Sequence, residues 1–123
     1  MLNYDGNLFD AGEIAAMSAL LNTKVPAYED EKVVREKREK PLKINNVVTS
    51  ATFAKINSGM VLDPSGNEAG AASARLTVAT DGGAIRAMQK GLWGSFTKKE
   101  IEEMAEVAMQ KHAELKKHIE SAR

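Results

Sequence analysis

Two carboxylates near the middle of the chain, Asp63 and Glu68, are the residues best placed for chemistry. Carboxylates this close together can bind a divalent metal or act as acid and base in phosphate chemistry. Only alanine, glycine and serine follow the pair as far as Ser73. The pair therefore lacks the further ligands of a metal site, and the residue pattern predicts no catalytic residue, no bound metal and no cofactor.

The two histidines are the next candidates for metal binding. On a helix, His112 and His118 are separated by a rotation of about 240°, which places them on different faces. Because the chain also contains no cysteine, they do not form a credible metal site. We expect His112 to be partly buried and hydrogen-bonded, and His118 to pair with Glu114 on the surface.

Hydroxyl, glycine and aromatic residues between positions 82 and 97 are the last candidates. Ser95 and Thr97 have no base nearby in the sequence that could activate them. Gly82-Gly83 and Gly91–Gly94 lack the spacing of phosphate-binding loops, so they predict turns. Trp93, the only tryptophan, could stack on a nucleobase, but we favour a plug over the edge of the core or a contact with another subunit.

Four β-compatible runs must position these residues. They are Val47–Asn57, Met60–Asp63, Ala74–Thr80 and Ala84–Lys90. The last two are joined by Asp81-Gly82-Gly83, which supplies the positive φ angles of a tight hairpin. Between the second and third runs we expect a turn over Pro64–Asn67 and a loop over Glu68–Ser73.

A long amphipathic helix is predicted after the hairpin. Thr97 and Glu100 have the spacing of a capping box, and Phe96 and Ile101 flank it as a hydrophobic staple. The helix should run from about residue 98 to about residue 121, and 3-and-4 spacing defines its buried face. The members of that face are Ile101, Met104, Ala105, Ala108, His112, Leu115 and Ile119. The pattern as a whole predicts an α/β fold of the two-layer α+β type, in which this helix covers a four-stranded antiparallel or mixed sheet.

The N-terminal segment predicts the end of a strand at residues 2–7, followed by a helix. Asp10 and Glu13 fit an aspartate version of the capping box, and the helix should end near Asn22 because Pro26 prevents much continuation. An apolar stripe on one helix cannot cover itself. We therefore expect the second lobe or another chain to cover its members, Ile14, Met17, Leu20 and Leu21.

Residues 29–40 carry ten charged side chains in twelve positions. Four of the five basic members, Arg35, Lys37, Arg38 and Lys40, could be interpreted as a phosphate-binding patch. However, five acidic residues are interleaved with them (Glu29, Asp30, Glu31, Glu36 and Glu39), and electrostatic binding of nucleic acid needs unopposed cations. We favour a solvated linker, with a loose ribbon around Val33-Val34.

Composition limits the remaining function classes. The 123 residues balance 17 basic against 17 acidic side chains, so no overall field attracts nucleic acid or an anionic membrane. No apolar run approaches the roughly 18 residues that a membrane helix needs. The absence of cysteine suits a reducing compartment, and we expect a cytoplasmic protein without a membrane partner.

Several segments, in their order along the chain, resemble the second half of RNase PH-type subunits. These segments are FAKI (53–56), VLDP (61–64), ARLTVAT (74–80), IRAMQKG (85–91) and GSFTKKEI (94–101). The stretch YDGNLFDAGEIAAMSALLNTKVP (4–26) is similar to the helix that closes the first half of the same proteins. Within this family, the chain most resembles the non-catalytic RNase PH-like ring subunit of the archaeal exosome.

The resemblance implies three parts: a strand end and helix left from a first domain (1–26), a charged linker (27–43) and an RNase PH-like C-terminal domain (44–123). It also implies a longer protein. We therefore expect the chain to be a fragment, produced by truncation, by proteolysis or by a split or mis-started gene.

Catalytic subunits of this family carry a set of acidic residues after the VLDP-like strand. Laid on this sequence, two of those positions fall on Asp63 and Glu68, and two others fall on Ala69 and Arg75. A cation in the last position cannot bind a metal or act as an acid or base in place of a carboxylate. The resemblance therefore implies a chain that is not an enzyme by itself.

The same resemblance implies a scaffold and RNA-path subunit in a hetero-hexameric ring, alternating with a catalytic RNase PH-like exosome subunit. RNA enters the assembled ring, which shortens it from the 3′ end with inorganic phosphate. Two alternatives stay open at this point. The chain could be a fragment of an active RNase PH-type phosphorolytic exoribonuclease, or a small α/β protein-interaction module unrelated to RNA.

Overall fold

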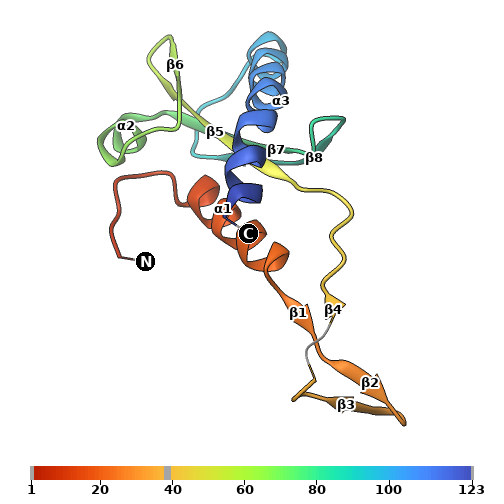
Figure 1. Ribbon diagram of the computed structural model, residues 1–123. Coiled ribbons are helices and arrows are strands. Elements are labelled where there is room, and N and C mark those ends of the chain that lie inside the picture. Colours follow the sequence, from red (N-terminus) through yellow and green to blue (C-terminus); the bar gives the residue numbers. More distant parts are fainter. Residues whose placement is uncertain (1, 38–39, 123) are drawn as a thin grey trace.

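The structure is a computed structural model that describes residues 2–37 and 40–122. Its helices are α1 (Leu8–Leu21), α2 (Gly66–Ala71) and α3 (Lys98–Ser121). Its strands are β1 (Lys24–Val25), β2 (Ala27–Glu29), β3 (Lys32–Val34), β4 (Lys40–Pro41), β5 (Thr49–Ile56), β6 (Gly59–Leu62), β7 (Ala74–Thr80) and β8 (Ile85–Gly91). Figure 1 shows a sheet beside the long helix α3, and a ribbon that projects away from both. No helix in these described ranges is long and apolar enough to cross a membrane.

The main sheet is four-stranded and antiparallel throughout, in the order β6-β5-β7-β8. All four predicted strands are confirmed, and the open choice between an antiparallel and a mixed sheet is resolved as antiparallel. The turn between β7 and β8 has its positive φ at Gly82, at +85°. A Cβ there would lie 2.6 Å from the His112 ring, so this glycine is needed for its conformation and for its space.

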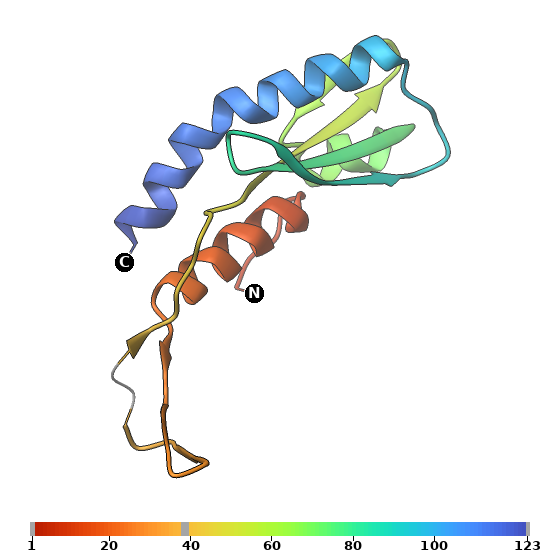
Figure 2. The ribbon, with the colours of Figure 1, turned by 90° about the vertical axis from the view of Figure 1, so that its right-hand side faces the viewer.

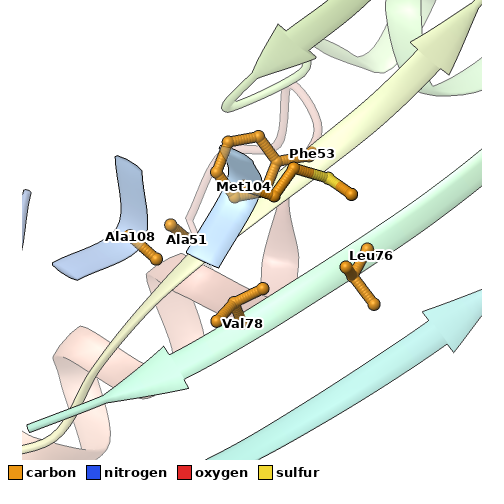
Figure 3. Close-up of a cluster of buried hydrophobic side chains, with 6 residues drawn as sticks. All are labelled: Ala51, Phe53, Leu76, Val78, Met104 and Ala108. Atoms are coloured by element: carbon orange, nitrogen blue, oxygen red, sulfur yellow. The ribbon is translucent and has the colours of Figure 1, made fainter. Parts of the chain in front are cut away.

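The apolar core lies between α3 and one face of the sheet (Figure 3). Ala51 and Phe53 of β5 are paired in register with Val78 and Leu76 of β7, and all four face α3. From the helix, Met104 and Ala108 complete the buried cluster, each 2% exposed. None of the seven residues predicted for the buried face of α3 is exposed, so that prediction is confirmed.

The start of α3 is fixed as the sequence predicts. The Thr97 hydroxyl accepts from the Glu100 amide at 3.2 Å, and the Glu100 carboxylate accepts from the Thr97 amide at 2.6 Å. These two bonds satisfy amides that would otherwise lack partners at the helix end. Phe96 and Ile101 both pack against the core cluster.

The opposite face of the sheet is polar and is covered by α1. Figure 2 shows α1 and α3 on opposite sides of the strands. The buried residues on this second face include Ser50, Thr52 and Thr77. Of the predicted α1 stripe, Ile14, Met17 and Leu21 are half-buried while Leu20 is 40% exposed. Contacts of α1 with β5 and α3 therefore cover the stripe only in part.

Three local predictions are wrong. Residues 2–7 form no strand, because nothing in the described chain pairs with them. Asn7, in the left-handed region, caps α1 in place of Asp10. The turn and loop expected over residues 64–73 contain the short helix α2, which begins with a capping box formed by Ser65 and Glu68.

The segment between α1 and β5 contains a ribbon of short strands. Strands β2 and β3 pair as a hairpin at its far end, and β1 pairs with β4 between that hairpin and α1. The ribbon extends away from the sheet in both views (Figures 1 and 2). Tyr28 and Val33, which are register partners in the hairpin, are 71% and 56% exposed. Arg38 and Glu39, which belong to the charged run, lie outside the described residues.

We predict that Met104→Ala lowers the free energy of unfolding by about 2–5 kcal/mol, because it empties a fully enclosed place between α3 and the sheet. Urea unfolding followed by far-ultraviolet circular dichroism measures this. Met109→Ala is the matched control on the same helix, since Met109 is 40% exposed, and it should change stability by less than about 0.5 kcal/mol. Equal losses in both variants would show that α3 is packed differently.

Candidate functional site

The carboxylates singled out by the sequence are used in structural hydrogen bonds. Asp63 follows β6 with φ +56° and accepts a 2.6 Å bond from the Asn7 side-chain amide. Glu68 accepts from the backbone amide and the hydroxyl of Ser65, each at 2.9 Å. These bonds lower the pKa of Glu68, since they favour its charged form. Within the described residues, no group of three acidic, histidine or cysteine side chains is arranged to hold a metal.

The two positions that depart from the acidic pattern, Ala69 and Arg75, lie at one cavity of about 140 Å³ between α1, α2 and the sheet. Its lining consists of Tyr4, Asn7, Leu8, Phe9, Thr52, Pro64, Ala69 and Arg75. Arg75 is the only charged residue in that lining. Its guanidinium lies over the ring of Phe9, 4.9 Å from the ring centre, a cation–π contact. This cavity offers a fixed cation and no carboxylate.

Asp10 is the best-connected polar residue near this cavity. Its carboxylate accepts four hydrogen bonds, from the Ser50 hydroxyl (2.7 Å), the Thr52 hydroxyl (2.8 Å), the Thr52 amide (2.8 Å) and the Asn7 side chain (2.8 Å). Asn7 donates from the same nitrogen to Asp63. The acidic groups here are therefore occupied in joining α1 to β5 and to the end of β6.

A second cavity, of about 380 Å³, adjoins this network between α1, β5, β6 and α3. Its lining brings Asp10 and Asp63 together with Lys111 and Glu114 of α3. Lys111 pairs with Glu114 at 3.1 Å, so the predicted pairing of Glu114 with His118 is wrong. The carboxylates in this cavity are thus either hydrogen-bonded within the fold or paired with a lysine. Its lining contains no histidine and no hydroxyl placed beside a base that could activate it.

Glu13, one turn after Asp10, is the unusual titratable group. Both of its carboxyl oxygens are buried without a hydrogen-bond partner in the described chain. Burial is the main cause that raises the pKa of Glu13 to about 7; the Ser50 backbone opposes the rise in part, and the charge of Asp10 adds to it. A buried carboxyl without partners favours its neutral form.

His112 and Thr97 are placed as predicted. His112 is 7% exposed, and its Nδ1 lies 3.0 Å from the Thr49 hydroxyl. His118 is exposed. Thr97 serves as a helix cap, and the Ser95 carbonyl accepts from Lys55 at 3.3 Å. The structure does not bring these side chains together into a nucleophile and base.

Trp93 lies on the surface, with 102% of its reference area exposed. The prediction of a plug over the core edge is therefore wrong, and the base-stacking and subunit-contact interpretations stay open. The neighbouring Gly94 is a turn residue that approaches the backbone closely, because its amide donates to the Ser73 carbonyl at 2.8 Å. A Cβ on Gly94 would lie 2.7 Å from that carbonyl oxygen.

Comparison with known proteins places these residues in a family context. Residues 46–111 match the model of the 3′ exoribonuclease family, domain 2. An exosome complex component Rrp42 from Methanothermobacter thermautotrophicus is 37% identical over 99% of this chain and 46% of its own length. The Rrp42 component from Pyrococcus horikoshii is 42% identical over 97% of this chain and 45% of its own length.

Solved structures agree with these relatives. A chain of the Archaeoglobus fulgidus exosome with RNA bound to the active site is 30% identical, with a TM-score of 0.79 over 95% of this chain and 45% of that one. A chain of an archaeal exosome core gives a TM-score of 0.81 at 30% identity, over 97% and 47% respectively. The present chain thus spans about half the length of the relatives that it matches, and it is similar to their C-terminal half.

Asp10→Ala should lower the free energy of unfolding by about 3 kcal/mol or more, because it leaves buried donors of β5 without an acceptor. Equilibrium unfolding in urea measures the loss, and Asp30→Ala on the exposed turn of the ribbon is the control. A loss below about 0.5 kcal/mol would show that the network does not hold α1 to the sheet.

Glu13→Gln should stabilise the chain increasingly as pH rises. The folded-state pKa of Glu13, about 7, lies above its ordinary value of 4.5, so the wild type loses stability as pH rises between these two values and the neutral variant does not. The unfolding free energy of the variant minus that of the wild type should therefore grow from about pH 5 to about pH 7.5. Glu106→Gln, at an exposed position of α3, should give no such trend, and a flat difference for Glu13→Gln as well would contradict the assignment.

Proposed function

The chain belongs to the 3′ exoribonuclease family, domain 2, and from this membership we propose that it is the second lobe of a non-catalytic subunit in an exosome-type ring. The ring would shorten RNA from its 3′ end by phosphorolysis. In it, this chain would form part of the scaffold and of the RNA path beside a catalytic RNase PH-like subunit. A cytoplasmic location goes with this role, and the absence of cysteine supports it.

One observation carries the non-catalytic assignment. Arg75 is the only charged residue lining the small cavity, at a position where resemblance to catalytic subunits places a carboxylate. A guanidinium stays protonated in proteins and has no acceptor lone pair, so it cannot replace a metal ligand or a proton-transferring carboxylate. Ala69 offers neither function. The carboxylates that remain, Asp63 and Glu68, are separately hydrogen-bonded to Asn7 and Ser65.

The first test is the native mass of the assembly that this chain forms in an extract of its own host. We expect a ring-sized complex that contains a catalytic RNase PH-like partner. The partner is identified by mass spectrometry after the complex has been isolated through a tag on this chain. A free monomer, or a tight complex with a protein unrelated to RNA, would favour the protein-interaction module instead.

A second test separates scaffold from enzyme. The purified chain should not shorten single-stranded RNA in the presence of inorganic phosphate, because its cavity lacks the carboxylates that the chemistry needs. Product formation would be followed by release of nucleoside diphosphates. If phosphate-dependent shortening appeared, and Asp63→Ala or Glu68→Ala removed it while the variants stayed folded, the active-enzyme alternative would replace the scaffold.

A further inference from the structure

The loop between β8 and α3 presents a large aromatic side chain that the fold does not use. Trp93 is fully exposed, and the adjacent Leu92 is 47% exposed. An indole exposed to this extent leaves both ring faces accessible. Burying a tryptophan normally contributes much to a core or an interface, so its complete exposure indicates a surface that acts through a partner.

The loop holds this tryptophan in a fixed place. Leu92 has φ +66°, a conformation that costs energy for a residue with a branched side chain. Its carbonyl accepts a 2.5 Å bond from the Lys90 ammonium. On the other side, the Gly94 amide is bonded to the Ser73 carbonyl. The indole is therefore carried by a loop tied to the sheet on both sides, which reduces the entropy lost when a ligand binds.

The segment that carries Trp93 is rich in cations, and the carboxylates that pair with three of them lie just outside it, at Asp81, Glu102 and Glu103. Residues 82–99 contain four cations and no acidic residue, in a chain whose net charge is zero. The cations are Arg86, Lys90, Lys98 and Lys99. Arg86 is paired with Asp81, whereas Lys90 forms no ion pair among the described residues. Lys90, three residues before the indole, is therefore the member of this set that no carboxylate offsets in the described chain.

Lys98 and Lys99 are placed against the electrostatic preference of their helix. Cations are unfavourable in the first turn, near the positive end of the helix dipole. Their pairs with Glu102 and Glu103, at 3.5 and 3.6 Å, have the weaker order with lysine first. Both lysine side chains are nearly fully exposed, at 89% and 86%, so these exposed pairs contribute little. The stability of α3 does not account for two lysines at this place.

We propose that Trp93, with Lys90, Lys98 and Lys99, binds single-stranded nucleic acid. An unpaired base would stack on the indole, and the flanking phosphates would contact the lysines. Lys90 has no ion pair among the described residues, and the pairs of Lys98 and Lys99 are exposed and weak, so these three cations stay available to phosphates, which favours a polyanion as the occupant. That the strand is RNA rests on the proposed function, whereas the stacking surface itself does not.

The experiment measures binding of a short, unpaired, fluorescently labelled oligonucleotide by anisotropy, with RNA and DNA versions in parallel. Trp93→Ala should weaken binding roughly 5- to 150-fold, the range expected for one stacked base. Tyr28→Ala is the matched control, because Tyr28 is an exposed aromatic on the distant ribbon, and it should bind as the wild type does. Lys98→Gln combined with Lys99→Gln should flatten the dependence of affinity on salt.

Trp93 also reports binding directly, because it is the only tryptophan in the chain. Stacking of a base on the indole should quench the intrinsic fluorescence. The quenching should saturate as oligonucleotide is added and should be reversed by added salt. The proposal is overturned if Trp93→Ala and wild type bind equally, or if bound oligonucleotide leaves the emission unchanged. It is also overturned if the emission shows Trp93 already buried in a protein complex without nucleic acid. The native mass of the complex formed by Trp93→Ala is measured in parallel. The variant should still assemble into the ring, so loss of the ring and loss of the stacking site can be told apart.

Discussion

The arrangement of this molecule depends on the carboxylate of Asp10, which accepts hydrogen bonds from donors on the polar face of the sheet. Strand β5 is buried on both sides, but only the side toward α3 is apolar. On the other side the Ser50 and Thr52 hydroxyls and the Thr52 amide need acceptors, since unpaired buried donors are costly. Asp10 accepts from all three. Helix α1 is therefore held to the sheet by hydrogen bonds as much as by its half-buried apolar side chains.

The position of α1 in turn decides what the small cavity contains. With Asp10 fixed on β5, the preceding residue Phe9 lies over the Arg75 guanidinium. On the far side of Arg75, Gly91 leaves room for it, because a Cβ there would lie 3.1 Å from Nη2. Among the described residues, the cation is thus packed between an aromatic ring and a backbone without an acidic partner. The contact that closes the second face of the sheet also fixes this positive charge, at a position where the resemblance to catalytic subunits places a carboxylate.

Local signals in the sequence were sufficient for the parts of the fold that local interactions determine. The hairpin, the cap at Thr97 and the buried face of α3 follow from spacing within a few residues. The role of Asp10 could not be predicted in the same way, since its partners on β5 are about forty residues away in the sequence. Its place near the start of α1 suggested a helix cap instead. The signal for α2 was present, because Ser65 and Glu68 have capping-box spacing, but its glycines and short length pointed to a loop.

Two of the surfaces with exposed apolar side chains differ in the charges around them, and these charges distinguish the partners that the surfaces fit. Leu8 and Phe9, about half exposed on α1, lie on the helix that Asp10 anchors, next to hydrogen-bonded carboxylates. The charges beside them are of both signs, because the Arg75 guanidinium lies over the Phe9 ring, and a mixed setting of this kind suits another protein surface. Trp93 is more exposed, and it lies on a loop fixed by Lys90 and Gly94. Apolar exposure alone would assign both surfaces to protein contacts. Lys90, which has no ion pair among the described residues, and the weakly paired Lys98 and Lys99 separate the second surface from the first.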